Sequence, residues 1–256
     1  MDKKDNLEEL MGDLDISNDK DEELVFDDEI DEVNNKFELC LVGKFLTEKN
    51  LNVRAMKSEM VDLWRPARGG NIKMLIMGLF LFQFYYKDDM QWMMNNDPWS
   101  FDNAILVTNT IPAGVDPTKV HLNEVELWIQ IFDLPSEFIS ESIGKQLGNL
   151  FGSFVMYDQN NNTSIWREYM RIKIKVDVRM PLKRRKKICS KYRKECIVSC
   201  KYENLADFCF LCGMLTHTER FCKKKFDGEI DGLVRGWGNW LRAPSRRGRR
   251  KGGVSG

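Results

Sequence analysis

The chain has 256 residues, 43% of them hydrophobic, which is enough for one ordinary domain with appendages or for two small domains. Its formal net charge of zero hides a strong segregation of charge. Residues 1–35 hold 15 Asp or Glu and three Lys, whereas residues 167–256 hold 25 basic and nine acidic residues. This asymmetry indicates an acidic tail and a half that binds a polyanion.

The same features argue against secreted and membrane proteins. The acidic start is unlike a secretory signal, and the longest apolar stretch, residues 74–86, is shorter than the roughly 20 residues of a membrane-spanning helix. Seven cysteines without such a signal favour metal binding over disulfides. We therefore expect an intracellular protein, in the nucleus or the cytoplasm, with no membrane partner.

Residues 1–35 lack a sustained apolar period, so we predict a disordered acidic tail. A solvating role is the simplest interpretation. Alternatively, the tail competes with nucleic acid for the basic half, or it contacts a protein partner of unknown identity.

Residues 36–110 carry the periodicities of a compact α+β domain. Alternating or continuous apolar runs predict strands over residues 39–46, 72–77, 79–86 and 104–108. Helical periods predict helices over residues 53–64 and 88–95. The resulting β-α-β-β-α-β order is that of ferredoxin-like and RNA-recognition domains.

The aromatic strand of this domain lacks the pattern of an RNA-stacking platform. Phe80, Phe82 and Phe84 share one side, and an alignment with the RNA-recognition pattern places Leu79 and Leu81 at the RNA-facing positions. We therefore predict that the three rings belong to the core. The alternative is that they form a binding face.

Residues 120–205 predict a second small α+β unit. Strands are expected over residues 125–131, 153–157, 169–178 and 196–202, with a helix that is capped by Ser136 or Ser140 and ends near residue 151. In the third of these strands, Arg171, Lys173 and Lys175 alternate with apolar residues and form a basic face. Residues 183–187 read as an exposed turn. The two units show no strict sequence repeat.

Residues 206–225 contain the most specific motif of the chain. Cys209, Cys212, His217 and Cys222 follow the spacing C-x2-C-x4-H-x4-C, which is typical of a CCHC zinc knuckle. Three thiolates and one imidazole fill all four positions around zinc and leave none for a catalytic water. The sequence therefore predicts a structural zinc site and a protein that is not an enzyme.

The residues around this motif suggest contacts with nucleic acid. Phe210 can stack on a base, and the cationic side chains can neutralise phosphates. The predicted phosphate contacts are Arg220, Lys223, Lys224, Lys225, Lys183, Arg184 and Arg185. Residues 226–256 form a basic tail, rich in Arg and Gly over residues 246–253.

The remaining cysteines and the second histidine carry weaker signals. Cys189, Cys196 and Cys200 could form part of a second metal site, but thiols on a strand are more often buried apolar groups. Cys40 is expected in the core, and His121 on the surface.

Five stretches together make the chain resemble the plant domain-of-unknown-function 4283 family, whose members carry a C-terminal zinc knuckle and derive from LINE-type retrotransposons. They are residues 79–84 (LFLFQF), 96–101 (NDPWSF), 127–135 (LWIQIFDLP), 201–205 (KYENL) and 238–243 (GNWLRA). The resemblance implies a zinc-binding, nucleic-acid-binding protein derived from a retrotransposon. The chain departs from the family pattern at Ala206, where Pro is usual, and at Thr216, where Gly is usual before the ligand histidine. A stiffer loop at Thr216 would affect base contact more than zinc binding.

Two functions remain open at this point. The first is zinc-dependent binding of RNA or single-stranded DNA by the knuckle and its basic flanks. The alternative is a protein–protein interaction adaptor in which the knuckle is purely structural.

Overall fold

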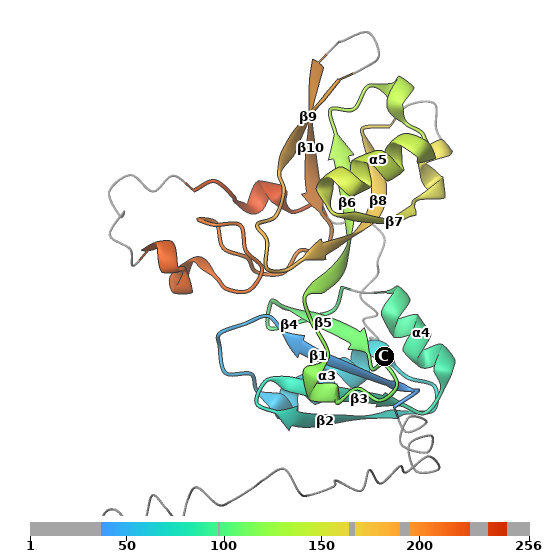
Figure 1. Ribbon diagram of the computed structural model, residues 1–256, viewed down its shortest axis with the longest axis vertical. Coiled ribbons are helices and arrows are strands. Elements are labelled where there is room, and N and C mark those ends of the chain that lie inside the picture. The colour runs from blue at the N-terminus through green and yellow to red at the C-terminus, as the bar shows by residue number, and fades with distance from the viewer. Residues whose placement is uncertain (1–36, 97, 164–166, 190–194, 226–234, 245–256) are drawn as a thin grey trace, which may run out of the picture.

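The structure is a computed structural model that describes residues 37–96, 98–163, 167–189, 195–225 and 235–244 (Figure 1). The predicted acidic tail over residues 1–35 lies outside the described residues, and so does most of the predicted basic tail over residues 226–256. The described residues form two five-stranded sheets in which all strand pairs are antiparallel. No helix among them is long and apolar enough to cross a membrane.

The first unit contains the strands and helices that the periodicity predicts, plus one short strand, β4, that it does not. The elements are β1 (Cys40–Phe45), α3 (Val53–Trp64), β2 (Gly70–Ile76), β3 (Leu79–Phe84), α4 (Lys87–Asn95), β4 (Ser100–Phe101) and β5 (Ala104–Thr110). The strand order in the sheet is β2-β3-β1-β5-β4, with β1 at the centre.

Helix α3 shows how local sequence determines where a helix begins and ends. The side chain of Asn52 accepts a hydrogen bond from a backbone amide of the first turn, and Arg65 ends the helix in a left-handed conformation with φ of 43°. Met56, Met60 and Trp64 lie on one face of the helix and are buried against the sheet.

The three phenylalanines of β3 belong to this core, as the sequence predicts. Phe80, Phe82 and Phe84 are at most 3% exposed and pack with residues of α3 and α4. The Trp64 ring meets the Phe82 ring edge-on, with centroids 5.3 Å apart. These rings therefore hold the first unit together and form no binding face.

The described residues of the second unit form one α-helix and five strands. They are β6 (Glu124–Phe132), α5 (Glu141–Phe151), β7 (Ser153–Tyr157), β8 (Tyr169–Asp177), β9 (Arg185–Cys189) and β10 (Glu195–Tyr202). The strand order is β7-β8-β6-β10-β9. Ser140, rather than Ser136, is the N-cap of α5, and its side chain accepts a hydrogen bond from the amide of Ile143.

The prediction of an exposed turn over residues 183–187 is wrong. Strand β9 begins at Arg185 and pairs with β10, with Arg185 opposite Ser199 and Lys187 opposite Ile197. Because β9 is an edge strand, the side chains of Arg185 and Lys187 reach solvent while the backbone pairs with β10. A run of basic residues therefore fits an edge strand as well as a turn.

The two sheets share one strand order, although their sequences show no strict repeat. Strands β1, β2, β3, β4 and β5 occupy the positions of β6, β7, β8, β9 and β10, and a helix follows the central strand in both units. The second unit has no helix equivalent to α4 between β8 and β9. Instead, Leu205, Phe208 and Leu215 from the segment after β10 pack in its core.

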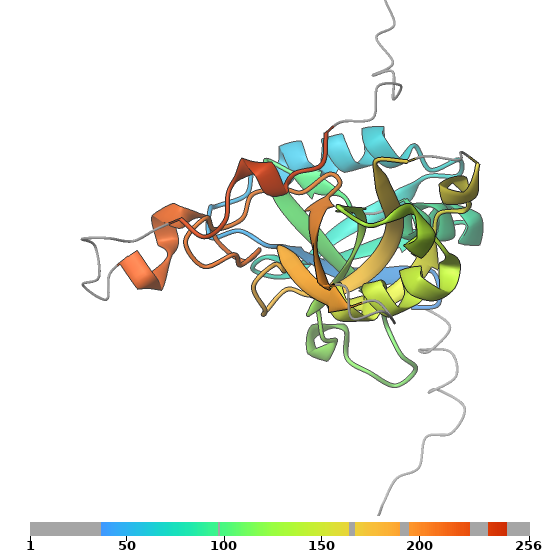
Figure 2. The same cartoon turned by 90° about the horizontal axis from the view of Figure 1, so that it is seen from above.

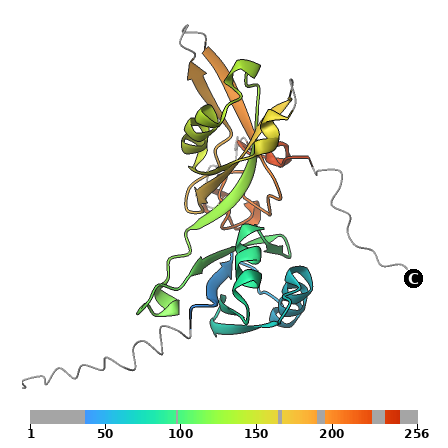
Figure 3. The same cartoon turned by 90° about the vertical axis from the view of Figure 1, so that its right-hand side faces the viewer.

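The central part of the first sheet is buried on both faces, whereas Asn71, Lys73 and Gln83 at its β2 edge are exposed. On the side opposite its helices, Val42, Leu79, Ile105 and Val107 are at most 9% exposed and join the apolar cluster of the second unit. The side view shows the two units stacked on each other (Figure 3). The centre of the sheet face on which RNA-recognition domains stack bases is therefore covered in this protein.

Candidate metal centre and nucleic-acid interface

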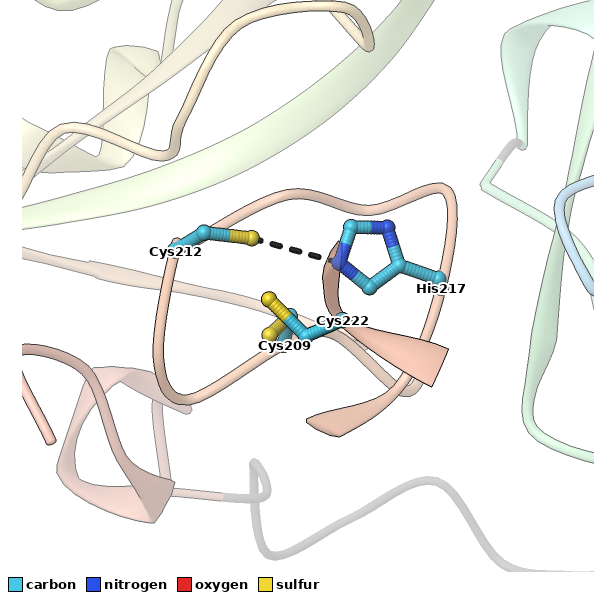
Figure 4. Close-up of side chains that lie close together, drawn as sticks. All are labelled: Cys209, Cys212, His217 and Cys222. Carbon is cyan, nitrogen blue, oxygen red and sulfur yellow. Dashed lines mark hydrogen bonds between the residues drawn. The ribbon is translucent and has the colours of Figure 1, made fainter. Parts of the chain in front are cut away.

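The structure brings together all four predicted metal ligands. One ligand atom from each of Cys209, Cys212, His217 and Cys222 lies within 4.8 Å of the others. The Cys212 sulfur lies 3.3 Å from Nε2 of His217 (Figure 4). The three cysteines are buried and the histidine is half-buried. Among the described residues, this is the one group of His, Cys, Asp or Glu that could hold a metal ion.

Two tight turns produce this cluster. In the first, the amide of Gly213 donates to the carbonyl of Cys209 over 2.8 Å, and Gly213 has φ of +76°, a conformation that glycine adopts without strain. In the second, the short 3-10 turn Glu219–Phe221 leads into Cys222, whose amide donates to the carbonyl of Glu219. The turns point the thiols toward one another, so the sequence spacing becomes a four-ligand shell.

The donor set fits a zinc ion. Three sulfurs and one imidazole nitrogen form a closed tetrahedral set. Burial raises the pKa of the Cys209 thiol to about 12 and that of Cys212 above its usual 9.0, so both thiols keep their protons at neutral pH unless a cation replaces them. Zinc would supply that cation and release the protons on binding.

Thr216 supports the ligand histidine from outside the cluster. Its hydroxyl oxygen lies 3.2 Å from Nδ1 of His217. When Nε2 is the metal ligand, Nδ1 carries the proton, and its N–H donates a hydrogen bond to the Thr216 hydroxyl oxygen. The sequence shows Thr216 only as a departure from a usual glycine, and its contact with the histidine is apparent only in the structure.

The segment of residues 235–244, which we term the clasp, returns to hold the knuckle. The amide of Trp237 donates to the carbonyl of Phe210 over 3.1 Å, and its indole N–H donates to the carbonyl of Leu182 over 2.8 Å. The indole lies so close to Gly213 that an added Cβ would be 2.3 Å from the ring. The clasp therefore joins the knuckle to the second unit. Sequence reasoning gave Trp237 no role.

The predicted nucleic-acid contacts near the last zinc ligand are accessible. Lys223, Lys224 and Lys225 form a short exposed turn directly after Cys222, and Arg220 is also exposed. Figure 2 shows this orange segment projecting to one side of the two sheets. These four side chains stay predicted phosphate contacts.

Three other predicted nucleic-acid contacts, Phe210, Lys183 and Arg184, have partners within the protein. The Phe210 ring is half-buried and meets the Phe208 ring with centroids 5.0 Å apart. The Lys183 ammonium donates to the carbonyl of Leu150, and burial lowers its pKa. The Arg184 guanidinium lies 4.4 Å from the centre of the Trp237 ring. Lys183 and Arg185 are both exposed, and Arg185 lies on β9.

The basic face predicted on β8 is neutralised. Arg171 forms ion pairs with Asp158 and Glu203, at 3.0 and 2.8 Å. Lys173 pairs with Glu126 at 2.8 Å, and Lys175 with Glu124 at 3.8 Å. The predicted basic face is therefore a network of paired charges. The sequence does not show this, because the acidic partners come from other strands and loops than β8.

The remaining cysteines do not gather into a second cluster. Cys200 is buried, donates to the carbonyl of Lys183 over 3.3 Å, and has its pKa raised to about 12 by burial. Cys196 is half-buried, and Cys189 is exposed on β9. Cys40 is buried, as predicted, and His121 is exposed.

Comparisons with known proteins find a family match for the first unit and another for the segment that contains the knuckle. Residues 33–119 match the family described as Domain of unknown function (DUF4283), and residues 176–224 match the family described as Zinc knuckle. An uncharacterized protein of Arabidopsis thaliana is 23% identical over 134 residues, a match that covers 52% of this chain and 42% of that protein.

A crystal structure of the N-terminal three RNA binding domains of the yeast splicing factor Prp24 aligns with 73% of this chain and 80% of that chain. The sequence identity is 13% and the TM-score is 0.23, a likeness too weak to bear on fold or function. The ligand geometry and the zinc knuckle match together identify zinc as the metal of the cluster, and residues 33–119 are similar to the DUF4283 family.

Proposed function

We propose that the protein binds single-stranded nucleic acid, RNA or DNA, through its zinc knuckle. The observation that carries this proposal is the position of Lys223, Lys224 and Lys225. They are exposed and follow the last zinc ligand directly, in a turn where the amide of Lys225 donates to the carbonyl of Cys222 over 3.0 Å. Zinc thus fixes three cations in place for phosphate contacts.

The first unit then has a supporting role. We propose that it has the ferredoxin-like topology and positions the knuckle without binding bases itself. Two observations support this: the covered centre of the sheet, and the hydrogen bond from the amide of Asp207 to the carbonyl of Asn103. Because the zinc ligands leave no open coordination position, we also propose that the protein is not an enzyme.

A salt titration of oligonucleotide binding tests the proposal. The logarithm of the binding constant of the zinc-loaded chain should fall with the logarithm of salt concentration, with a slope of about −0.7 for each phosphate contact. A chelator should weaken binding, because the lysine turn loses its anchor at Cys222. Binding that neither salt nor chelator changes would contradict the proposal.

A second candidate is a protein–protein adaptor with a purely structural knuckle. The packing of the knuckle favours it, since Phe210 and Arg184 contact the Phe208 and Trp237 rings. A pull-down of partners that survives nuclease treatment, together with no measurable oligonucleotide affinity, would support this candidate over the first.

The origin and location of the protein are also proposals. We propose a plant protein derived from a retrotransposon, as the resemblance in sequence implies; the similarity to an Arabidopsis thaliana protein supports the plant source. We propose an intracellular location, in the nucleus or the cytoplasm, where a reducing environment keeps the zinc thiolates available. Fluorescence microscopy of the tagged full chain in plant cells checks this, and accumulation outside the cell would contradict it.

A further inference from the structure

A cleft of about 340 Å³ lies between the knuckle and the loop after β1, and the zinc ligands Cys212, His217 and Cys222 form part of its wall. Its walls include Glu48 from the first unit and Thr216, Phe221, Lys223 and Lys224 from the knuckle. A volume of this size is at the lower end of the range for small-ligand pockets. The cleft therefore combines one carboxylate, one aromatic ring and two cations, contributed by two different units.

We propose that this cleft holds one unpaired base of a bound single strand, preferably a base that carries an exocyclic amino group. Phe221 supplies the stacking surface, Glu48 accepts a hydrogen bond from the amino group, and Lys223 and Lys224 contact the adjacent phosphates. The inference rests on the proposed function and adds to it the site and the class of base.

Phe221 suits this role better than Phe210, the aromatic residue that the sequence singles out. The Phe210 ring is half-buried and packs against Phe208, and its backbone carbonyl accepts a hydrogen bond from the clasp, so Phe210 already has partners within the protein. The Phe221 ring is half-buried, lines the cleft, and has the Arg220 guanidinium 5.6 Å from its centre. A base stacked there would lie close to a cationic side chain.

Glu48 gives the cleft its chemical preference. A carboxylate accepts hydrogen bonds and donates none, so it favours the amino group of cytosine over the carbonyl oxygen at the same position of uracil. Glu48 is exposed on the loop after β1 and lines both the cleft and the adjoining gap at the junction between the units. The adjoining gap, lined by Thr47, Asn103 and Thr218, has a volume of only about 10 Å³.

Substitution of the two phenylalanines tests the stacking role. Phe221→Leu should weaken binding of a labelled cytosine oligonucleotide, measured by fluorescence anisotropy, by about 5- to 150-fold, and Phe221→Tyr should restore it. Phe210→Leu should lower the melting temperature and leave the affinity of the folded protein close to wild type. Zinc content, measured for every variant, shows that the knuckle remains loaded. Wild-type affinity in Phe221→Leu would overturn the stacking role.

A charge-matched pair of variants tests the base preference. Glu48→Gln should reduce the preference for cytosine over uracil oligonucleotides by about fivefold or more, because an amide can also donate to uracil. Glu59→Gln, an exposed position on α3, has the same charge change and should leave the preference unaltered. If the wild-type chain binds no oligonucleotide, the proposed function itself fails. If it binds and the Glu48 and Phe221 variants match wild type, the cleft alone is refuted.

Discussion

Thr216 shows how one residue outside the ligand set can affect the zinc site. Its hydroxyl lies beside Nδ1 of His217, and the other ring nitrogen faces the cysteines. A partner of this kind fixes both the tautomer and the orientation of a ligand histidine. The glycine that usually precedes the ligand histidine in such motifs offers no side-chain acceptor.

We predict that Thr216→Val lowers zinc affinity by about 10- to 100-fold, because it keeps the shape of the side chain and removes the acceptor for Nδ1–H. Thr216→Ser should stay near wild type. Competition with a chromophoric chelator at fixed pH measures both variants. Equal affinities for the valine and serine variants would show that the hydroxyl plays no part in ligation.

The four zinc ligands could be predicted from spacing alone, because so short a loop brings its cysteines and histidine together in any compact conformation. The contacts of Phe210 and Arg184 could not be predicted from the sequence. Both are adjacent to chemistry-bearing residues in the sequence, but their contacts, Phe208 and Trp237, depend on how the clasp returns to the knuckle. A basic or aromatic residue in a motif is accessible only when no other part of the chain covers it.

At the scale of elements, the clasp supplies apolar contacts that so short a knuckle cannot make within itself. Trp237 covers Gly213, and Leu241 is fully buried. The side chain of Arg242 donates to the carbonyls of Leu205 and Ala206. The knuckle is therefore folded as part of the second unit.

We predict that Trp237→Ala destabilises the zinc-loaded protein by about 1–3 kcal/mol, since it removes the ring that packs on Gly213 and the indole hydrogen bond to Leu182. Trp240→Ala is the matched control, because the Trp240 side chain is 50% exposed. Urea unfolding followed by circular dichroism compares the two. Equal losses in both variants would contradict the role of the clasp.

The ion-pair network on β8 has a defined pH dependence. Burial alone would raise the pKa of Asp158, but a backbone hydrogen bond from Asn160 and the contact with Arg171 outweigh it and lower the pKa below 3.8. A lowered pKa means that the carboxylate stabilises the folded state fully above pH 3.8. This contribution is lost as the pH falls below that value.

Asp158→Asn should therefore cost about 1.5–3 kcal/mol of unfolding free energy near pH 7, the range for hydrogen bonds to charged groups. The difference from wild type should shrink as the pH falls below 3.8, where the wild-type carboxyl also becomes neutral. Urea unfolding at a series of pH values measures this. A difference that does not change with pH would contradict the assignment.

Most helices and strands were predictable, because periodicity and caps are local signals. Helix α3 has its predicted bounds, and Asn52 and Arg65 show the local contacts that end it. Strand β9 was not predictable in the same way. Its pairing with β10 is a long-range contact, and a basic run is compatible with either an edge strand or a turn.

For the whole molecule, the two units share a strand order but cover their sheets differently. The second unit lacks an equivalent of α4, so the segment after β10 fills its core. The apolar face of the first sheet closes against the same cluster. The lysine turn at the end of the knuckle remains accessible to a polyanion.

The sequence does not reveal this arrangement. Val42 and Val107 look like ordinary residues of a sheet buried on one face, and nothing local shows that a second unit covers them. The charge pattern of the sequence likewise does not show which charges are paired in the folded protein. The excess of positive charge in the last third of the chain counts Arg171 and Lys173, which carboxylates from other elements neutralise.

The most direct test of the central claim is the salt dependence of oligonucleotide binding after removal of the lysine turn. The zinc-loaded triple variant Lys223→Gln, Lys224→Gln, Lys225→Gln should lower the magnitude of the logarithmic salt slope by about 2, since each phosphate contact on a single strand contributes about 0.7. The control changes Lys73, Lys87 and Lys119, three exposed lysines outside the knuckle, to Gln and should keep the wild-type slope. Equal slopes for the two triple variants would contradict the claim that the zinc-anchored turn binds the nucleic acid backbone.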